Sequence, residues 1–121
     1  METFRTVTYE VHNPKIRNNV RFAVLADLHG NCFGENNGVL LEKTREYAPD
    51  AILLAGDMVV RMEPSTLETA GKLLCTLAKN FPIFYAMGNH ETKMKAKEHI
   101  YRNEYLEYQE ELKQKGICFL A

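Results

Sequence analysis

The sequence lacks several features that would assign it to a common class of protein. No apolar run approaches the ~18 residues of a membrane span, and the N-terminal residues show no signal-peptide pattern. The 15 Lys and Arg nearly balance the 16 Asp and Glu, and the net charge of −1 gives no electrostatic reason to bind nucleic acid or an anionic membrane. We therefore expect no specific nucleic-acid contact and, by default, a cytoplasmic protein. Membrane association through segments outside this stretch stays an alternative.

Cysteine is also scarce, and its spacing argues against two further classes. Cys32, Cys75 and Cys118 are far apart and form no C-x-x-C pair, which disfavours a disulfide framework and a zinc–thiolate site. Cys75 and Cys118 lie in apolar patterns, so we expect them to be small buried hydrophobic residues. No Gly-rich phosphate loop follows the first predicted strand, which leaves a nucleotide-binding α/β domain as a weak alternative.

What the sequence does contain is a set of three short polar motifs, each directly after an apolar run. The motifs are Asp27-Leu28-His29, Gly56-Asp57 and Gly88-Asn89-His90-Glu91. Asp57 follows Asp27 by 30 positions and Asn89 follows Asp57 by 32, which matches a strand–helix–strand unit of about 30 residues. Parallel strands would place all three motifs along one edge of a sheet, where open α/β folds bind their ligands.

These intervals predict a single α/β domain over residues 1–121, built from strand–helix–strand repeats with a mostly parallel sheet. The expected strands cover 3–11, 20–26, 51–55, 83–87 and 117–121, and the expected helices cover 37–47, 65–80 and 92–115. Ser65 with Glu68 has the pattern of a capping box at the start of the second helix. Opposite charges four positions apart, such as Glu98 and Arg102, favour one continuous third helix.

The residue types in the motifs suit a metal site. Side chains two apart on an extended segment point the same way, so Asp27 and His29 together offer an oxygen and a nitrogen. Asp57 follows a glycine that allows a sharp turn, and its two oxygens can bridge two cations. Asn89 adds a neutral carbonyl oxygen. Mixed oxygen and nitrogen ligands suit manganese, iron or zinc better than calcium.

Each motif alone is common, but the ordered set strongly resembles that of the calcineurin-like metallophosphoesterase family. The fragment Ala-Asp-Leu-His-Gly-Asn is similar to the bacterial phosphodiesterase-type members, and the resemblance covers roughly residues 20–121. It implies a dinuclear site with two divalent metal ions. In such a site Asp27 and His29 would bind one ion, Asp57 would bridge the pair and Asn89 would bind the second.

The resemblance also implies roles for the rest of the third motif. His90 would lie beside the substrate phosphate as general acid or transition-state stabiliser, with Glu91 as its orienting partner. The implied reaction is two-metal hydrolysis of a phosphodiester or phosphomonoester, and the implied partner is a small-molecule or lipid phosphoester. Lys93, Lys95 and Lys97 are predicted to form a solvated face, with contact to a bound phosphate as the alternative.

The sequence departs from the family pattern after these motifs. Family members carry a further isolated histidine and a Gly-His-x-His, whereas the other histidines here, His12 and His99, are predicted to be structural or surface residues. We therefore expect the chain to supply the N-terminal half of the family's αββα sandwich. This predicts weak or no activity for the isolated chain and self-association through an exposed sheet face. The alternative function is a non-catalytic metal-binding or scaffolding remnant.

Overall fold

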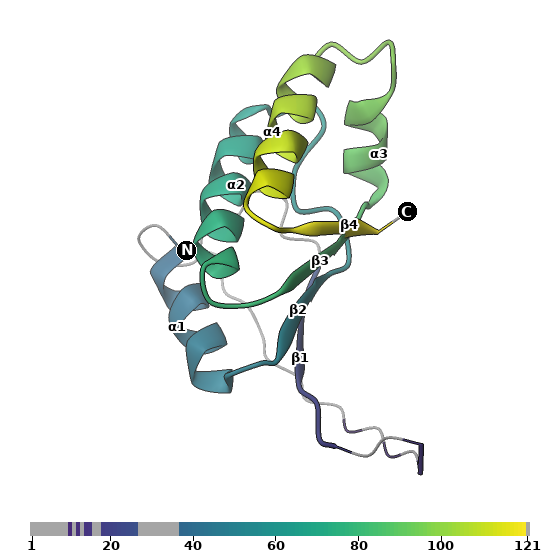
Figure 1. The fold of residues 1–121 in the computed structure, drawn as a ribbon. Helices are drawn as coiled ribbons and strands as arrows, with labels where there is room; N and C mark the ends of the chain where they lie inside the picture. Colours follow the sequence, from purple (N-terminus) through teal and green to yellow (C-terminus); the bar gives the residue numbers. More distant parts are fainter. Residues whose placement is uncertain (1–9, 11, 13, 16–17, 27–36, 121) are drawn as a thin grey trace.

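Strands and helices alternate along the chain and build one sheet (Figure 1). The structure, a computed structural model, describes residues 10, 12, 14–15, 18–26 and 37–120. Its elements are β1 (Phe22–Leu25), α1 (Gly38–Tyr47), β2 (Ala51–Leu54), α2 (Ser65–Ala78), β3 (Ile83–Ala86), α3 (Asn89–Lys95), α4 (Arg102–Gln114) and β4 (Cys118–Leu120). The strands are parallel in the order β1-β2-β3-β4, which confirms the expected α/β class.

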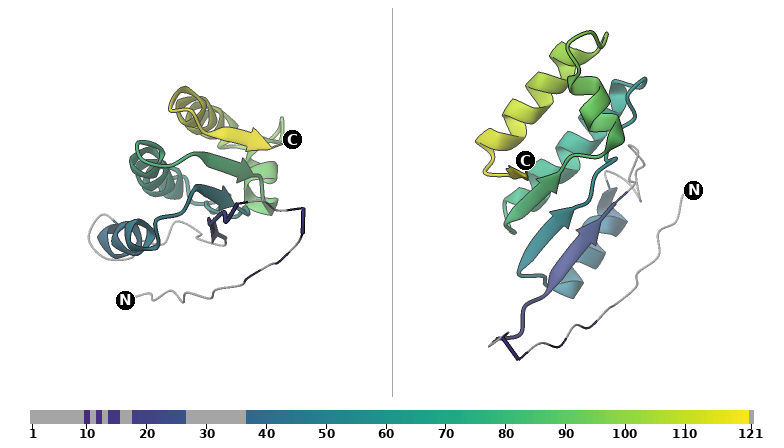
Figure 2. Two further views of the ribbon diagram at one scale, coloured as in Figure 1. Left: turned by 60° about the horizontal axis from the view of Figure 1, so that its bottom comes forward. Right: turned by 90° about the vertical axis from the view of Figure 1, so that its right-hand side faces the viewer.

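Helices α1, α2 and α4 cover the same face of the sheet (Figure 2). Each crossover joins a strand to its parallel neighbour, and right-handed crossovers that advance in one direction place their helices on one face. The carboxyl ends of the strands consequently share one edge, where the polar motifs were expected to meet. None of the helices in the described part of the chain has the length and apolar character that a membrane crossing needs.

The hydrophobic core lies between the sheet and these helices. Ile52 and Tyr85 from the strands are fully buried, and so are Leu74 of α2 and Leu112 of α4. The buried positions of α2 recur with helical spacing, as its sequence period predicts. They are Thr66, Leu67, Ala70, Leu73, Leu74 and Leu77.

The opposite face of the sheet carries apolar side chains that no described element covers. The strand register aligns Val24, Leu53, Phe84 and Cys118 across the four strands on this face. Val24 is 60% exposed and Leu120, two positions after Cys118, is 47% exposed. Cys118 was expected to be buried, but it is exposed because its register places it on this open face.

The single helix expected over 92–115 is wrong, because two helices occupy this range. At Ala96 the backbone adopts φ −57° and ψ 140°, which ends α3, and α4 then returns toward the sheet (Figure 1). The turn allows both Met94 of α3 and Leu112 of α4 to be fully buried. Burial stabilises by about 1.5–3 kcal/mol for each such side chain, whereas an i,i+4 charge pair contributes only about 0.2–0.5 kcal/mol.

The expected capping box at Ser65 and Glu68 is also wrong. Ser65 is the first residue of α2, after Pro64, and no side chain caps this helix end. Thr66 joins the helix to the preceding loop instead, since its hydroxyl accepts from the Val60 N–H at 2.9 Å and donates to a backbone carbonyl. The edge strand expected over 3–11 lies outside the described residues, apart from Glu10.

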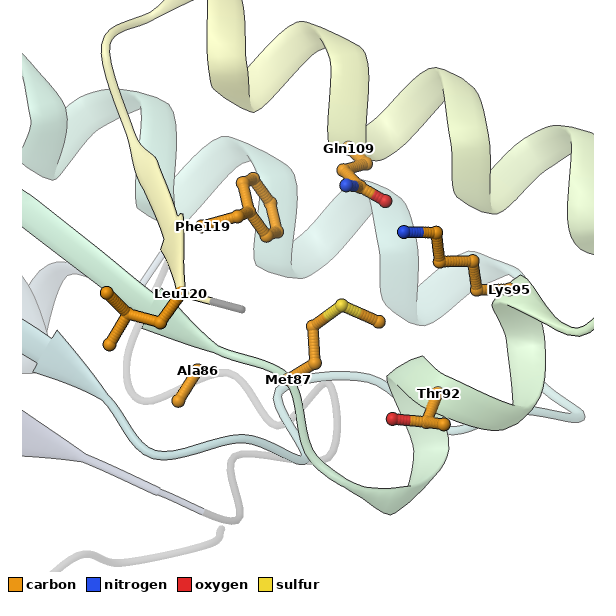
Figure 3. Close-up of a pocket in the computed structure, with 7 residues that line it drawn as sticks. All are labelled: Ala86, Met87, Thr92, Lys95, Gln109, Phe119 and Leu120. Atoms are coloured by element: carbon orange, nitrogen blue, oxygen red, sulfur yellow. The ribbon is translucent and has the colours of Figure 1, made fainter.

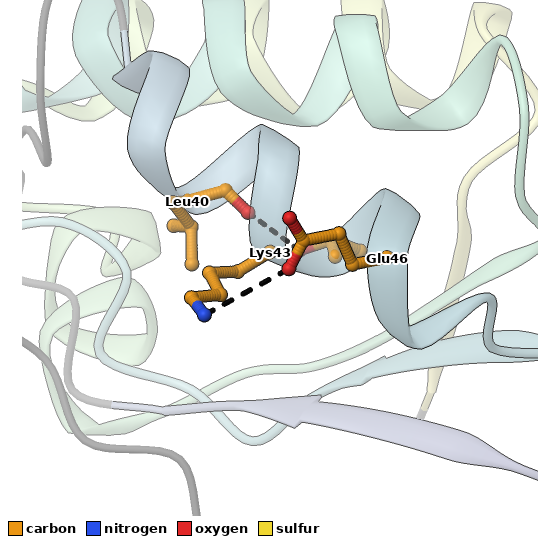
Figure 4. Close-up of polar contacts among 4 residues, drawn as sticks. Leu40, Lys43 and Glu46 are labelled. Carbon is orange, nitrogen blue, oxygen red and sulfur yellow. Dashed lines mark hydrogen bonds and ion pairs between the residues drawn. The ribbon is translucent and has the colours of Figure 1, made fainter.

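Helix α1 confirms the expected span over 37–47 to within a residue and shows how its two faces differ. Leu40 and Thr44 are buried, and the Thr44 hydroxyl donates to the Leu40 carbonyl at 2.8 Å. On the exposed side Lys43 and Glu46 form an ion pair at 3.7 Å (Figure 4). Helix α1, which lies in the crossover between β1 and β2, therefore packs its apolar face into the core.

Candidate metal centre

Two loops meet at the carboxyl edge of the sheet, one after β2 and one after β3. Gly56 lies in the first loop and Gly88 in the second, and their backbones are in close contact. A Cβ on Gly56 would lie 2.5 Å from the Gly88 Cα, and a Cβ on Gly88 would lie 2.4 Å from the Asp57 nitrogen. Gly56 also has a φ of +94°, which side chains disfavour. Both glycines are therefore required for this approach.

Asp57 is held against the start of α3 by this approach. Its Oδ1 accepts a hydrogen bond from the His90 N–H at 2.9 Å, while its own φ is +53°, a conformation uncommon for a residue other than glycine. Its Oδ2 accepts no hydrogen bond from any described residue. The exposed Asn89, the first residue of α3, is adjacent to this contact. One carboxylate oxygen and one amide oxygen are thus available to a cation here.

Glu91 is fully buried and joins the two loops from inside the protein. Its Oε1 accepts from the Asp57 N–H at 2.8 Å and the Gly88 N–H at 3.0 Å. Its Oε2 accepts from the Met58 N–H and from the Tyr85 hydroxyl, both at 2.8 Å. Four donors therefore satisfy this carboxylate, which compensates for its removal from water.

Two buried tyrosines extend the hydrogen bonds of Glu91 away from the carboxyl edge of the sheet. The hydroxyls of Tyr85 and Tyr108 are 2.9 Å apart, and the rings pack edge to face at 6.4 Å. Burial is the main cause that raises the pKa of Tyr85 well above its ordinary value, and the nearby Tyr108 and Glu91 raise this pKa further. Burial likewise raises the pKa of Tyr108. Both hydroxyls therefore remain protonated and can donate hydrogen bonds.

The His90 ring is fixed by the loop that follows β2. Its Nδ1 accepts a hydrogen bond from the Arg61 N–H at 3.1 Å, and the residue is half-buried. A backbone N–H can only donate, so Nδ1 of the neutral ring acts as acceptor and Nε2 carries the proton. In this arrangement Nε2 is a hydrogen-bond donor.

The structure brings four of the six predicted site residues to one edge of the sheet: Asp57, Asn89, His90 and Glu91. Asp27 and His29 lie outside the described residues. Within the part of the chain that the structure describes, no three His, Cys, Asp or Glu side chains form a group able to hold a metal ion. The oxygens of Asp57 and Asn89 fit a divalent cation by donor type, and the predicted complete site requires Asp27 and His29 as well.

The sequence analysis did not identify Tyr85 and Tyr108, the two core residues connected to Glu91, as part of the site. Nothing in the pattern around Tyr85 distinguishes it from other core positions of a buried strand. Tyr108 is buried where α4 packs on the sheet, and its hydroxyl contact with Tyr85 was not foreseen. Apart from the pattern, the residue type was the one available signal: a tyrosine rather than a phenylalanine at two core positions, since a buried hydroxyl needs a partner.

A cavity of about 440 Å³ opens beside the candidate centre, between α3, α4 and the ends of β3 and β4 (Figure 3). Met87 directly precedes Gly88, and Thr92 lies one turn after Asn89. The exposed Lys95 brings a positive charge to a mostly apolar wall. The lining residues are Ala86, Met87, Thr92, Lys95, Gln109, Phe119 and Leu120.

A comparison with protein families matches the chain to a known family. The model described as calcineurin-like phosphoesterase covers residues 20–119, a range that contains all three polar motifs, β1, β2, β3 and the first two residues of β4. No curated protein matches the chain.

Proposed function

We propose that this chain, which belongs to the calcineurin-like phosphoesterase family, is a metal-dependent phosphoester hydrolase with a dinuclear centre at the carboxyl edge of its sheet. The observation that carries the proposal is the convergence of Asp57, in the loop after β2, with Asn89 and His90 at the start of α3. The Asp57 Oδ1 accepts the His90 N–H, which leaves Oδ2 directed to other partners. Asp27 and His29 would complete the ligand set for the first ion.

Each described residue has a separate task in this proposal. Bound divalent ions would neutralise charge on the phosphate oxygens and supply a nucleophile at neutral pH. Asp57 would bridge the two ions, and the Asn89 carbonyl would bind the second without adding charge. Manganese, iron and zinc are the proposed metals, by ligand type.

His90 would act on the substrate rather than on a metal. Its Nδ1 accepts the Arg61 N–H, so the neutral ring presents Nε2–H as a donor to a phosphate or leaving-group oxygen. A ring in this tautomer has no lone pair on Nε2 with which to bind an ion. This supports the transition-state stabiliser of its two predicted roles, because a general acid needs the doubly protonated ring and that ring cannot accept the Arg61 N–H.

The substrate class proposed is a small-molecule or lipid phosphoester. The cavity of about 440 Å³ is lined by Met87 and Thr92, which directly flank the third motif in the sequence, and it would provide space for the group esterified to the phosphate. The sequence contains no Gly-His-x-His to supply further ligands, so hydrolysis by this chain alone is expected to be slow.

The test is the Asp57→Asn variant, assayed for Mn²⁺ binding by calorimetry and for Mn²⁺-stimulated hydrolysis of bis(p-nitrophenyl) phosphate. Loss of the bridging charge should lower hydrolysis by more than about 100-fold and weaken Mn²⁺ binding. Asp50→Asn, at the opposite end of β2, is the matched control and should retain both properties. Unchanged activity in Asp57→Asn would refute the assignment. Manganese binding by the wild type without hydrolysis would favour the non-catalytic metal-binding alternative.

A further inference from the structure

We propose that Tyr85 and Tyr108 are positioning residues for the metal-binding loop, acting on Asp57 through the buried Glu91. The inference rests on the proposed function only for the statement that Asp57 binds a metal. The contacts that carry it are all internal to the described chain, and neither tyrosine belongs to one of the three motifs.

The first step concerns Glu91, whose carboxylate is removed entirely from solvent. A buried carboxylate is tolerated when its oxygens accept enough hydrogen bonds. Three of its donors are backbone N–H groups, and Tyr85 supplies the fourth at 2.8 Å. Without this hydroxyl, Oε2 would depend on the Met58 N–H alone.

The second step fixes the direction of the hydroxyl pair. Tyr85 has one hydroxyl proton and donates it to Glu91. The contact of 2.9 Å between the two hydroxyls therefore requires Tyr108 to donate to the Tyr85 oxygen. Donation by Tyr108 polarises the Tyr85 hydroxyl and strengthens its bond to Glu91, as in other hydrogen-bond chains of the protein interior.

The third step links Glu91 to the geometry of Asp57. The two oxygens of Glu91 separately accept the Asp57 and Met58 N–H groups, which fixes the backbone on both sides of the Asp57 side chain. Asp57 has a φ of +53°, and such a conformation persists only where its surroundings enforce it. Loosening Glu91 should let this loop relax and move the Asp57 carboxylate away from the position that would bind metal.

The chain offers a closely matched control for the hydroxyls. Tyr105 lies on α4 three positions before Tyr108, it is fully buried, and its ring packs on Tyr108 at 5.7 Å. Among the described residues, its hydroxyl has no hydrogen-bond partner. Replacement of each tyrosine by phenylalanine removes one oxygen and leaves the packing of the ring in place.

The experiment compares Tyr85→Phe, Tyr108→Phe and Tyr105→Phe in the metal-free chain by amide hydrogen exchange. Tyr85→Phe should accelerate exchange at the Asp57 and Met58 amides by about tenfold, relative to the amides of β2. Tyr108→Phe should act in the same direction by a smaller factor, about threefold. Tyr105→Phe should leave these two amides unchanged.

Manganese affinity, measured by electron paramagnetic resonance, should fall most in Tyr85→Phe, less in Tyr108→Phe and not at all in Tyr105→Phe. Equal exchange in Tyr85→Phe and Tyr105→Phe would overturn the inference, and so would acceleration spread evenly over all strands. If Tyr85→Phe does not fold, Tyr108→Phe decides the question by the same comparison. If the wild-type chain binds no manganese, the proposed function fails, while the exchange pattern still decides whether the tyrosines position the loop.

Discussion

His90 and Glu91 are neighbours in the sequence but lie in different environments. His90 is half-buried, and its ring accepts the Arg61 N–H, whereas Glu91 is fully buried and accepts four hydrogen bonds from groups behind the site. Consecutive helical residues do not share a face. The ring of His90 is therefore held by the loop after β2. Glu91, which was predicted to orient His90, accepts its hydrogen bonds from the backbone around Asp57 and from Tyr85 instead.

The proposed role of His90 can be separated from metal binding in the His90→Ala variant. Because Nδ1 accepts a backbone N–H and Nε2 carries the proton, the variant should keep its Mn²⁺ content to within about twofold. Turnover of a phosphodiester should fall by about 10²–10³-fold, the usual contribution of a hydrogen-bond donor to a transition-state oxygen. Metal content is measured by plasma mass spectrometry and turnover by steady-state kinetics.

The control for this variant is His99→Ala. His99 is half-buried and its Nδ1 accepts the Tyr101 N–H, so this ring has a separate structural contact and its replacement should affect neither quantity. A large loss of metal in His90→Ala would mean that the histidine is a ligand and that its ring does not keep the Arg61 contact in solution.

Most elements could be predicted from the sequence because their periodicity is strong. The strands around Val24, Leu53 and Phe84 follow uninterrupted apolar runs, and α2 has an unbroken helical period. The break at Ala96 could not be foreseen, since local charge pairs continue across it and only the packing of Met94 and Leu112 favours the turn.

In the candidate site too, some contacts follow from patterns in the local sequence, while others depend on the packing of distant segments. Parallel strands of similar length dictate that the loops after β2 and β3 meet, so the convergence of Asp57 with His90 was predictable. The contact of Tyr85 with Tyr108 joins positions 23 apart and depends on how α4 packs on the sheet. No periodic pattern encodes a contact of this kind.

A methyl group added at Gly88, where the loops after β2 and β3 meet, should have the opposite effect on stability from one added at Gly71 in α2. Gly88→Ala should destabilise the chain by about 1–3 kcal/mol, because its Cβ would lie 2.4 Å from the Asp57 nitrogen and 2.6 Å from Oδ1. Gly71→Ala, within α2, should stabilise it by about 0.5–1 kcal/mol. There the added Cβ meets only the Tyr108 ring, at 3.8 Å, which is an ordinary contact.

Urea denaturation followed by circular dichroism measures both free energies of unfolding. The Gly71→Ala variant controls for the general effect of adding a methyl group to the backbone. A neutral Gly88→Ala variant would contradict the contact between the two loops.

At the scale of the whole molecule, the sheet divides the chain into two unlike sides. Helices α1, α2 and α4 cover one face (Figure 2), and the other presents Phe22, Val24 and Leu120 at 49%, 60% and 47% exposure. A contiguous apolar face of this kind is typical of an interaction surface. The net charge of −1 provides little repulsion between copies of the chain.

We propose that a second copy of the chain covers this face. Sedimentation velocity should then show a sedimentation coefficient that rises with concentration over about a hundredfold range. Val24→Lys should weaken the association by at least about tenfold, since it would bury an unpaired ammonium group in the interface. Val39→Lys is the matched control, because Val39 is 49% exposed but lies on α1, on the side of the helices. A wild-type chain that stays monomeric throughout, or equal effects of the two lysine substitutions, would show that copies of the chain do not pair through the open face of the sheet.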